Sequence, residues 1–192
     1  EIYLTFDDGP IPEVTPWVLD TLRSFDAKAT FFCVGDNVRK HPEIYDMVIH
    51  AGHTVGNHTL NHLSGWATEN ITYFHNIRHC ARMVNSGLFR PPYGKLKPSQ
   101  VQFLQRHYRI IMWDVLSGDF DRDIRPEDCA QNVIQHAEAG SIVVFHDSIK
   151  AEANLRHALP MVLEHFTREG YTFQSLPKLA PAVAERGLRV AV

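Results

Sequence analysis

The first ten residues, Glu1-Ile2-Tyr3-Leu4-Thr5-Phe6-Asp7-Asp8-Gly9-Pro10, contain the pattern from which the fold can be argued. Residues 2–6 form a short run dominated by apolar and β-branched side chains, which is typical of a strand buried on both faces. The run stops at two aspartates followed by glycine and proline, which together indicate a turn. The sequence therefore predicts a buried strand that delivers two carboxylates to the loop at its carboxyl end.

The same order, a short apolar run and then a helical pattern, recurs along the chain. A helix is expected after the first turn, with Thr15 as its N-cap and Pro16 at its first position. The further expected strands are 29–34, 54–56, 88–89, 110–113, 141–146 and 171–173, with a closing segment at 188–192. The expected helices between them are 42–51, 70–85, 98–107, one that begins at 126, and 152–169. Strands that alternate with helices favour parallel β/α units, and six or seven units suggest a barrel or an open sheet.

Length and composition are those of one globular domain, expected over residues 1–192, with 44% hydrophobic and 21% charged residues and no repeat or linker. Lys and Arg number 19 against 22 Asp and Glu, and no basic run exceeds two residues, so neither nucleic acid nor an anionic membrane is the expected partner. Cys33, Cys80 and Cys129 lack ligand spacing and are interpreted as packing residues. No apolar stretch approaches the ~20 residues that cross a bilayer, so no transmembrane segment is expected. The compartment and the oligomeric state stay open.

Polar residues occur where the expected strands end. They are Asp7 and Asp8 after the first strand, His58 and His62 after the third, Arg90 after the fourth, Asp114 and Asp119 after the fifth, and His146 at the sixth. Loops at the carboxyl ends of the strands meet on one face of a β/α architecture, so residues far apart in the sequence can meet there. This distribution predicts a functional site on that face.

Two histidine pairs have the i, i+4 spacing that lets two imidazoles on one helical face bind a single ion. His75 and His79 lie within a long expected helix, where a solvated flank is the simpler interpretation. His58 and His62 follow a strand and a glycine, and two carboxylates follow another strand. From these residues alone, two interpretations of His58 and His62 stay open, a metal site and a structural role.

Asp7 and Asp8 suit metal-assisted hydrolysis, although a simple turn is the alternative. A divalent ion held by two histidines and one carboxylate keeps an open coordination position and polarises a carbonyl, while a second carboxylate can take a proton. His146 ends an apolar run, where a neighbouring carboxylate would keep it protonated as a proton donor; a hydrogen-bonded core histidine is the alternative. Taken alone, Arg90 is interpreted as one half of a surface ion pair.

Five segments, in this order, resemble the polysaccharide deacetylase family, the NodB-like domain of carbohydrate esterase family 4. They are Thr5-Phe6-Asp7-Asp8-Gly9-Pro10, His58-Thr59-Leu60-Asn61-His62, Arg90-Pro91-Pro92-Tyr93, Trp113-Asp114-Val115 with Asp119, and Val144-Phe145-His146-Asp147. The resemblance covers nearly the whole chain. It implies an α/β fold, a distorted (β/α) barrel of about seven units. It also implies removal of acetyl groups from a carbohydrate, such as peptidoglycan or a chitin-like polymer of N-acetylglucosamine.

The resemblance implies a role for each matching residue. Asp8, His58 and His62 would hold one divalent ion, with Zn²⁺ expected first and Co²⁺ or Ni²⁺ as alternatives. The implied catalytic residues are Asp7 as general base, Arg90 to orient it, Tyr93 as an oxyanion donor through its backbone N–H, His146 as general acid, and Asp119 as the carboxylate that keeps His146 charged. The implied substrate contacts are Trp113, Val144, Phe120 and Pro92.

Two residues depart from the family pattern. Phe120 stands where tryptophan is usual, which reduces the expected sugar-stacking surface, and Val144 stands where leucine is usual. The acidic segment 114–125 is expected to form a loop over the site. Two alternatives remain, deacylation of a small amide or ester and a catalytically inactive carbohydrate-binding relative. The complete set of acid, base and ligand residues argues against the inactive relative.

Overall fold

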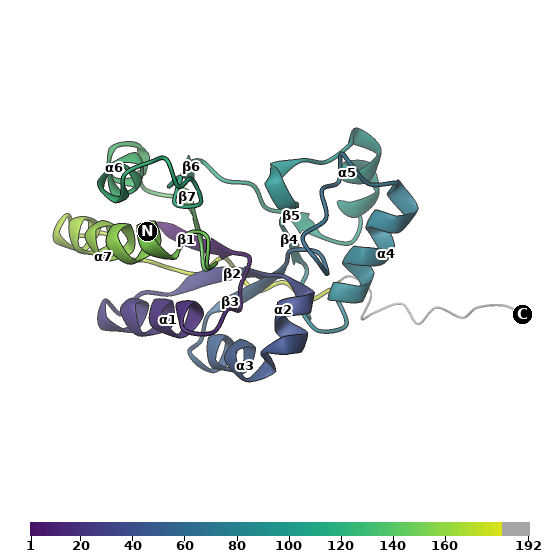
Figure 1. Cartoon of the computed structure of the whole chain (residues 1–192), viewed down its shortest axis with the longest axis horizontal. Coiled ribbons are helices and arrows are strands. Elements are labelled where there is room, and N and C mark those ends of the chain that lie inside the picture. The colour runs from purple at the N-terminus through teal and green to yellow at the C-terminus, as the bar shows by residue number, and fades with distance from the viewer. Residues whose placement is uncertain (182–192) are drawn as a thin grey trace, which may run out of the picture.

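Seven parallel strands form the centre of the computed structural model, which describes residues 1–181 (Figure 1). The strands are β1 (Tyr3–Asp7), β2 (Ala29–Cys33), β3 (Thr54–Asn57), β4 (Leu88–Phe89), β5 (Arg109–Ile110), β6 (Val115–Leu116) and β7 (Ile142–His146). Their order in the sheet is β5-β4-β3-β2-β1-β7-β6. Within the described residues β5 and β6 are the two edges, so the sheet is an incomplete barrel. The expected distorted (β/α) barrel is confirmed.

Helices lie in five of the six connections between the strands, the exception being that between β5 and β6, and a further helix follows β7. They are α1 (Val14–Ser24), α2 (Gly35–Lys40), α3 (Pro42–His50), α4 (Asn70–Cys80), α5 (Pro98–Leu104), α6 (Pro126–His136) and α7 (Glu152–Arg168), with a 3-10 turn, η1 (Pro92–Gly94). In Figure 1, α1, α6 and α7 lie toward one end of the molecule, α4 and α5 lie toward the other, and α2 and α3 lie between them. Parallel strands need such crossovers, and the helices cover the apolar sheet.

The core is built around β1, which also carries a residue of the candidate site described below. Phe6 is fully buried and stacks against Phe31 of β2, with ring centroids 5.0 Å apart, and against Phe145 of β7, at 6.0 Å. Burying an aromatic side chain of this size stabilises the fold by about 1.5–3 kcal/mol. The three rings follow the strand register, which pairs Phe6 with both partners. This packing fixes the residues that follow Phe6 at the carboxyl end of β1.

The expected strand at 110–113 is wrong in a way that matters for the site. The chain forms β5 at one edge of the sheet and β6 at the other, and residues 111–114 cross the gap between them. The carbonyls of Ile111 and Met112 accept hydrogen bonds from the Arg90 guanidinium, at 3.3 and 3.1 Å. A side chain thus replaces a neighbouring strand as the partner of these two carbonyls.

Several expected boundaries are also corrected. α1 begins at Val14 after Glu13, so Thr15 is not the N-cap; its hydroxyl accepts from the Ile11 N–H and donates to Asp147. The helices expected at 70–85 and 98–107 end at residues 80 and 104, while α2 was not expected at all. The expected strand 171–173 is a single bridge, and segment 188–192 lies outside the described residues.

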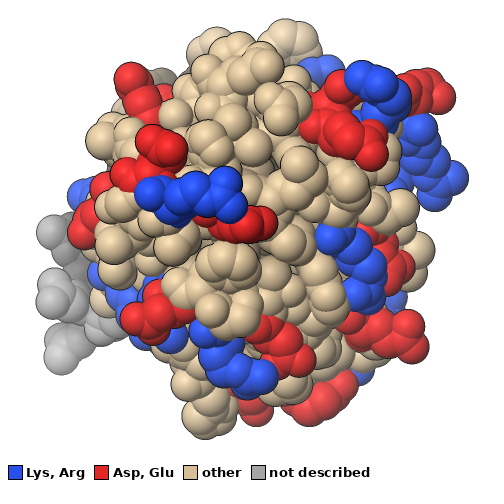
Figure 2. Space-filling model, turned by 90° about the vertical axis from the view of Figure 1, so that its left-hand side faces the viewer, with Lys and Arg blue, Asp and Glu red and all other residues tan. Residues whose placement is uncertain are grey.

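Charges of both signs are mixed on the surface. On the face shown in Figure 2, Lys and Arg side chains stand beside Asp and Glu, without a field of one sign. Cys33, Cys80 and Cys129 are buried free thiols. In residues 1–181, none of the helices has the length and apolar character required to span a membrane.

Candidate active site

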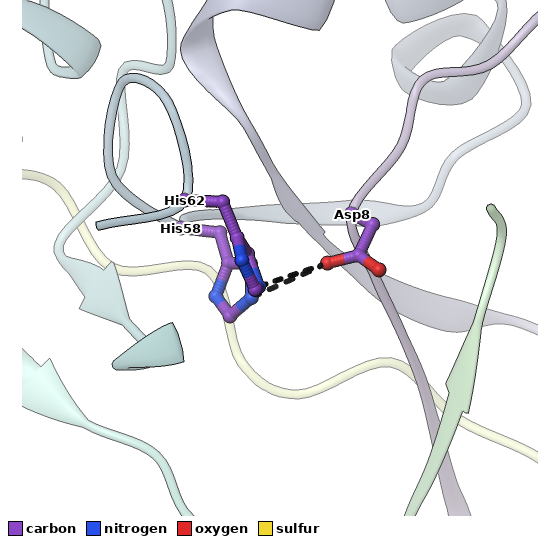
Figure 3. A group of neighbouring side chains, drawn as sticks. All are labelled: Asp8, His58 and His62. Atoms are coloured by element: carbon purple, nitrogen blue, oxygen red, sulfur yellow. Dashed lines mark ion pairs between the residues drawn. The ribbon is translucent and has the colours of Figure 1, made fainter. Parts of the chain in front are cut away.

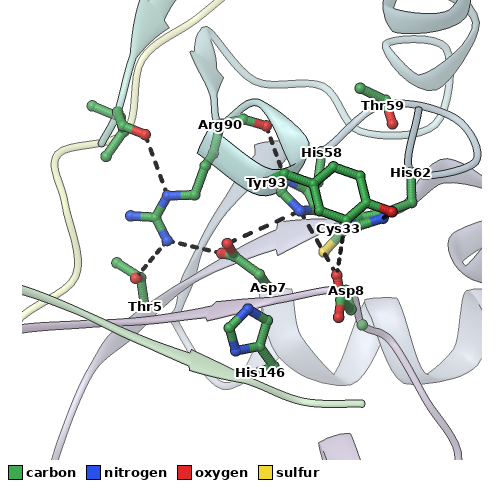
Figure 4. Close-up of polar contacts among 12 residues, drawn as sticks. Thr5, Asp7, Asp8, Cys33, His58, Thr59, His62, Arg90, Tyr93 and His146 are labelled. Atoms are coloured by element: carbon green, nitrogen blue, oxygen red, sulfur yellow. Dashed lines mark hydrogen bonds and ion pairs between the residues drawn. The ribbon is translucent and has the colours of Figure 1, made fainter. Parts of the chain in front are cut away.

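The carboxyl ends of β1 and β7 bring Asp7 and His146 side by side. The two residues are paired in the register of these strands, and the Asp147 N–H donates to the Asp7 carbonyl at 3.1 Å. Asp8 follows with a φ of 86°, a left-handed conformation that is uncommon outside glycine. Through this change of direction, neighbouring carboxylates reach different partners. Figure 4 shows Asp7 directed to Arg90, and Asp8 lying beside a pair of histidines.

His58 and His62 lie together although their segment is not helical. β3 ends one residue before His58, and Thr59 and His62 have φ values of 66° and 60°, so the chain turns instead of continuing as a helix. His62 Nε2 lies 3.2 Å from Asp8 Oδ1, and His58 Nε2 lies 3.7 Å from the same atom (Figure 3). The two rings are therefore brought together by a turn, and not by the helix that the i, i+4 spacing suggested.

The outer ring nitrogens are held by neighbouring groups. His58 Nδ1 lies 2.8 Å from the Arg90 carbonyl, which can only accept, so Nδ1 carries the proton and Nε2 presents a lone pair toward Asp8. His62 Nδ1 lies 3.2 Å from the Tyr93 hydroxyl. Hydrogen bonds of this kind fix the tautomer and direction of metal-binding imidazoles.

These three residues fit a divalent cation. One ligand atom from each of Asp8, His58 and His62 lies within 4.8 Å of the others. Asp8 Oδ1 is buried without a hydrogen-bond partner, and it faces the lone pair of His58 Nε2, an arrangement that a cation between them would stabilise. Burial lowers the pKa of His58 despite the nearby aspartates, which favours the neutral ligand form. Burial alone would raise the pKa of Asp8, but the close approach of His62 and the charges of the surrounding histidines lower it to about 2.

Asp7 is oriented by a buried arginine. Arg90 is fully buried, and its Nη1 donates to Asp7 Oδ1 at 2.8 Å and to the Thr5 hydroxyl at 2.7 Å. The guanidinium also lies over the Phe32 ring, 4.2 Å from its centroid. Asp7 Oδ2 remains on the side of His58 Nε2, 4.0 Å away. Asp7 is thus a nearly buried carboxylate with one oxygen engaged by Arg90 and the other directed toward the Asp8 group.

His146 is held in its charged form by a buried carboxylate. Asp119 Oδ1 lies 2.7 Å from His146 Nδ1, and Asp119 Oδ2 accepts the His146 backbone N–H at 2.7 Å. Burial would lower the pKa of His146, but the hydrogen bond and charge of Asp119, with the charges of Asp7 and Asp8, raise it to about 9. At neutral pH the imidazole is therefore a cation whose Nε2–H is available as an acid.

These side chains border a cavity of about 440 Å³. Its lining residues are Asp7, Asp8, His58, His62, Pro91, Tyr93, Gly94, Lys95, Trp113, Leu116, Phe120, Val144, His146 and Lys150. Three of the expected substrate contacts lie in this lining, namely Trp113, Val144 and Phe120. The fourth, Pro92, is buried and is not part of the lining, whereas its neighbour Pro91 is.

Two sets of predicted residues lie away from the cavity wall. Arg90 and Asp119 stand behind Asp7 and His146 and act on the cavity through them. His75 and His79 lie on α4 and are not part of the three-residue cluster. Sequence reasoning missed Lys95 and Lys150, because exposed residues in loops carry no periodic signal, and it missed Leu116, which lies on the two-residue strand β6.

Comparisons with known proteins agree with this fold. A family model for polysaccharide deacetylases matches residues 1–108. The chain is 31% identical over 185 residues to a peptidoglycan-N-acetylglucosamine deacetylase of Bacillus cereus, with 93% of this chain and 87% of that protein covered. It is also 31% identical to a chitooligosaccharide deacetylase of Azorhizobium caulinodans, with 92% of each covered.

The fold is shared with a solved enzyme. The crystal structure of a peptidoglycan N-acetylglucosamine deacetylase in complex with 4-naphthalen-1-yl-N-oxidanyl-benzamide superposes with a TM-score of 0.87 and 29% identity, covering 92% of this chain and 86% of that one. The chain therefore belongs to the polysaccharide deacetylase family, and the resemblance inferred from its five sequence segments is confirmed.

Proposed function

We propose that the protein is a metal-dependent hydrolase that removes acetyl groups from a poly- or oligosaccharide containing N-acetylglucosamine. One observation carries the proposal: a carboxylate, Asp7, and a histidine cation, His146, are paired across two strands beside the Asp8–His58–His62 group, at one cavity. Hydrolysis of an amide needs a base for the attacking water and an acid for the departing nitrogen. Relatives that match 93% and 92% of the chain carry names of glycan deacetylases.

Asp8, His58 and His62 would hold one divalent ion, with zinc the first expectation for nitrogen and carboxylate donors. When bound, such an ion polarises the acetyl carbonyl and activates water. Asp7 accepts the proton of the attacking water, because its Oδ2 faces the cluster while Arg90 holds Oδ1. Arg90 thereby fixes the direction of the base.

His146 completes the reaction as the acid. Its Nδ1 is bonded to Asp119, so Nε2 is the proton donor, and the pKa of about 9 keeps that proton in place at neutral pH. The bond between the carbonyl carbon and nitrogen breaks as His146 protonates the nitrogen. The products are acetate and a free amino sugar, and the proton on Asp7 restores the acid.

The remaining lining residues fit the acetyl group and the sugar. Trp113 and Val144 form an apolar wall for the methyl group, and the Tyr93 N–H is assigned to the oxyanion of the tetrahedral intermediate. Phe120 contributes a ring face for sugar stacking, packed edge-on against His146 at 5.1 Å.

Acetate release tests the proposal. Metal-loaded protein is incubated with N-acetylglucosamine oligomers, peptidoglycan fragments, acetylxylan and a small N-acetyl amide. Asp7→Asn should keep its metal and lose about 10²–10⁴-fold in rate, as expected for loss of a general base. Release from the small amide alone would favour a small-molecule deacylase. Near-normal turnover of Asp7→Asn with metal bound would contradict the assignment of the base.

A further inference from the structure

Two lysines stand at the cavity that the chemistry above does not use. Lys95 follows η1, and Lys150 follows His146 by four residues; both are exposed and both line the cavity. The strands that precede them, β4 and β7, are separated in the sheet by β3, β2 and β1. The two ammonium groups therefore reach the cavity from opposite halves of the sheet.

Neither lysine side chain forms a hydrogen bond or an ion pair within residues 1–181. Lys28 and Lys97 donate to backbone carbonyls, at 2.8 Å each, which holds their ammonium groups against the protein. Lys95 and Lys150 have no such bond, and no carboxylate in the described part of the chain lies within 4.0 Å of either ammonium nitrogen. The carboxylates of the cavity itself are directed to Arg90 and to the histidine pair. Two positive charges thus remain free to bind an anion at the cavity.

Each ammonium group also lies near an aromatic ring. Lys150 Nζ is 5.6 Å from the centre of the Phe120 ring, and Lys95 Nζ is 6.0 Å from that of Trp66. Trp66 is 63% exposed, and its indole N–H is fixed by the Leu96 carbonyl at 2.9 Å. An aromatic face beside a cation offers a surface for a sugar ring and a charge for an acidic substituent on that ring.

We propose that Lys95 and Lys150 bind carboxylates on the sugars that flank the N-acetylglucosamine unit being deacetylated, so that the enzyme selects acidic glycans over neutral ones. The inference rests on the proposed function and specifies its substrate class. Exposed ion pairs are weak, so each lysine contributes about two- to fivefold in kcat/KM. The contribution decreases with salt, because at ~1 M the screening length is about 3 Å, against ~10 Å at 0.1 M.

The test compares two substrates that differ in charge and by one methyl group on each carboxyl. One is a tetrasaccharide of alternating N-acetylglucosamine and N-acetylmuramic acid, whose lactyl groups are carboxylates, and the other is its methyl ester. The measured quantity is the ratio of kcat/KM for the acid to that for the ester, at 0.05 and 1 M NaCl. Variants are Lys95→Gln, Lys150→Gln and, as a control with the same change in charge, Lys40→Gln on α2, which does not line the cavity.

We expect a ratio well above one in the wild type at low salt, decreasing toward one at high salt. Lys95→Gln and Lys150→Gln should each lower it two- to fivefold, and Lys40→Gln should leave it unchanged. A wild-type ratio of one, or equal ratios in all variants, overturns this inference and leaves the proposed deacetylase intact. Absence of acetate from acid, ester and neutral chitotetraose with metal-loaded protein overturns the proposed function, and the inference with it.

Discussion

Arg90 Nη1 lies 2.8 Å from Asp7 Oδ1, and the same guanidinium donates to the two carbonyls that cross the gap of the barrel. One buried side chain therefore holds the segment that joins the two edge strands and orients the proposed base. The cost of burying this charge is offset by its four hydrogen bonds to oxygen, one of which is also the ion pair with Asp7, and by the Phe32 ring.

Arg90→Gln should destabilise the fold by about 3–5 kcal/mol, because it leaves the buried Asp7 carboxylate without its partner. Denaturant unfolding measures the change. Arg23→Gln is the matched control, since its ion pair with Asp20 is exposed at 2.7 Å and is worth about 0–1 kcal/mol. Equal losses for both variants would contradict the structural role of Arg90.

Metal content should depend on one histidine pair and not on the other. His58→Ala removes a ligand from the Asp8 group, so the purified variant should lose its divalent ion, while His75→Ala and His79→Ala should keep it. Elemental analysis gives the stoichiometry. Metal should also raise the thermal midpoint of the wild type more than that of His58→Ala, because binding to the native state alone is stabilising. Loss of metal from the α4 variants instead would mean that the site was misplaced.

The fold and the components of the site were predictable because short apolar runs alternate with helical patterns, and because polar residues stand at the ends of five of the expected strands. The burial of β1 and the turn after it were visible in residues 1–10, and so was the pairing of residue types suited to hydrolysis. What could not be read from the sequence depends on tertiary contacts. Segment 110–113 has the composition of a strand, yet Arg90, which lies 21 and 22 residues upstream of Ile111 and Met112, donates hydrogen bonds to their carbonyls. The turn at Thr59 that brings His58 and His62 together is likewise not marked by glycine or proline.

The pH dependence of activity should report the pair of His146 and Asp119. In the wild type the pKa of His146 is raised to about 9, so the acid form is present below that value and the rate should decrease as the pH rises through it. Burial lowers the pKa of His146, and Asp119→Asn removes the carboxylate that contributes most to raising it. The decrease should then occur at lower pH, toward or below the ordinary histidine value of about 6.5. Profiles of kcat/KM from pH 5 to 10 measure the change, and an unmoved alkaline limb with metal bound would contradict the role of Asp119.

Substrate affinity should respond to the ring at position 120. Phe120→Trp enlarges the stacking face and adds an indole N–H, so the KM for N-acetylglucosamine oligomers should decrease with unchanged metal content. Phe120→Leu, which keeps an apolar side chain and removes the ring, should raise the KM. If both variants match the wild type, this ring does not contact the sugar.

The loop that carries Asp8 should depend on the contact between Gly9 and Asp147. Asp147 Oδ1 accepts the Gly9 N–H at 3.0 Å, and a Cβ at Gly9 would lie only 2.0 Å from Asp147 Oδ2. In Gly9→Ala either the loop at residue 9 or the Asp147 side chain must therefore move, which should lower the free energy of unfolding by about 1–3 kcal/mol. Asp147→Ala makes room but leaves the buried donors of Gly9 and Thr15 without an acceptor, at about 1–3 kcal/mol each.

The loss of unfolding free energy in the double variant Gly9→Ala/Asp147→Ala should therefore be smaller than the sum of the losses in the single variants, by roughly 1 kcal/mol or more. Gly9→Ala combined with the distant surface change Asp20→Ala should be additive. Because Asp8 is bonded directly to Gly9, displacement of the loop should also weaken divalent-ion binding, measured by titration calorimetry with Zn²⁺. Additivity in both pairs, with wild-type affinity for Zn²⁺ in Gly9→Ala, would show that the loop adapts without moving its ligand, contrary to the tight contact found in the structure.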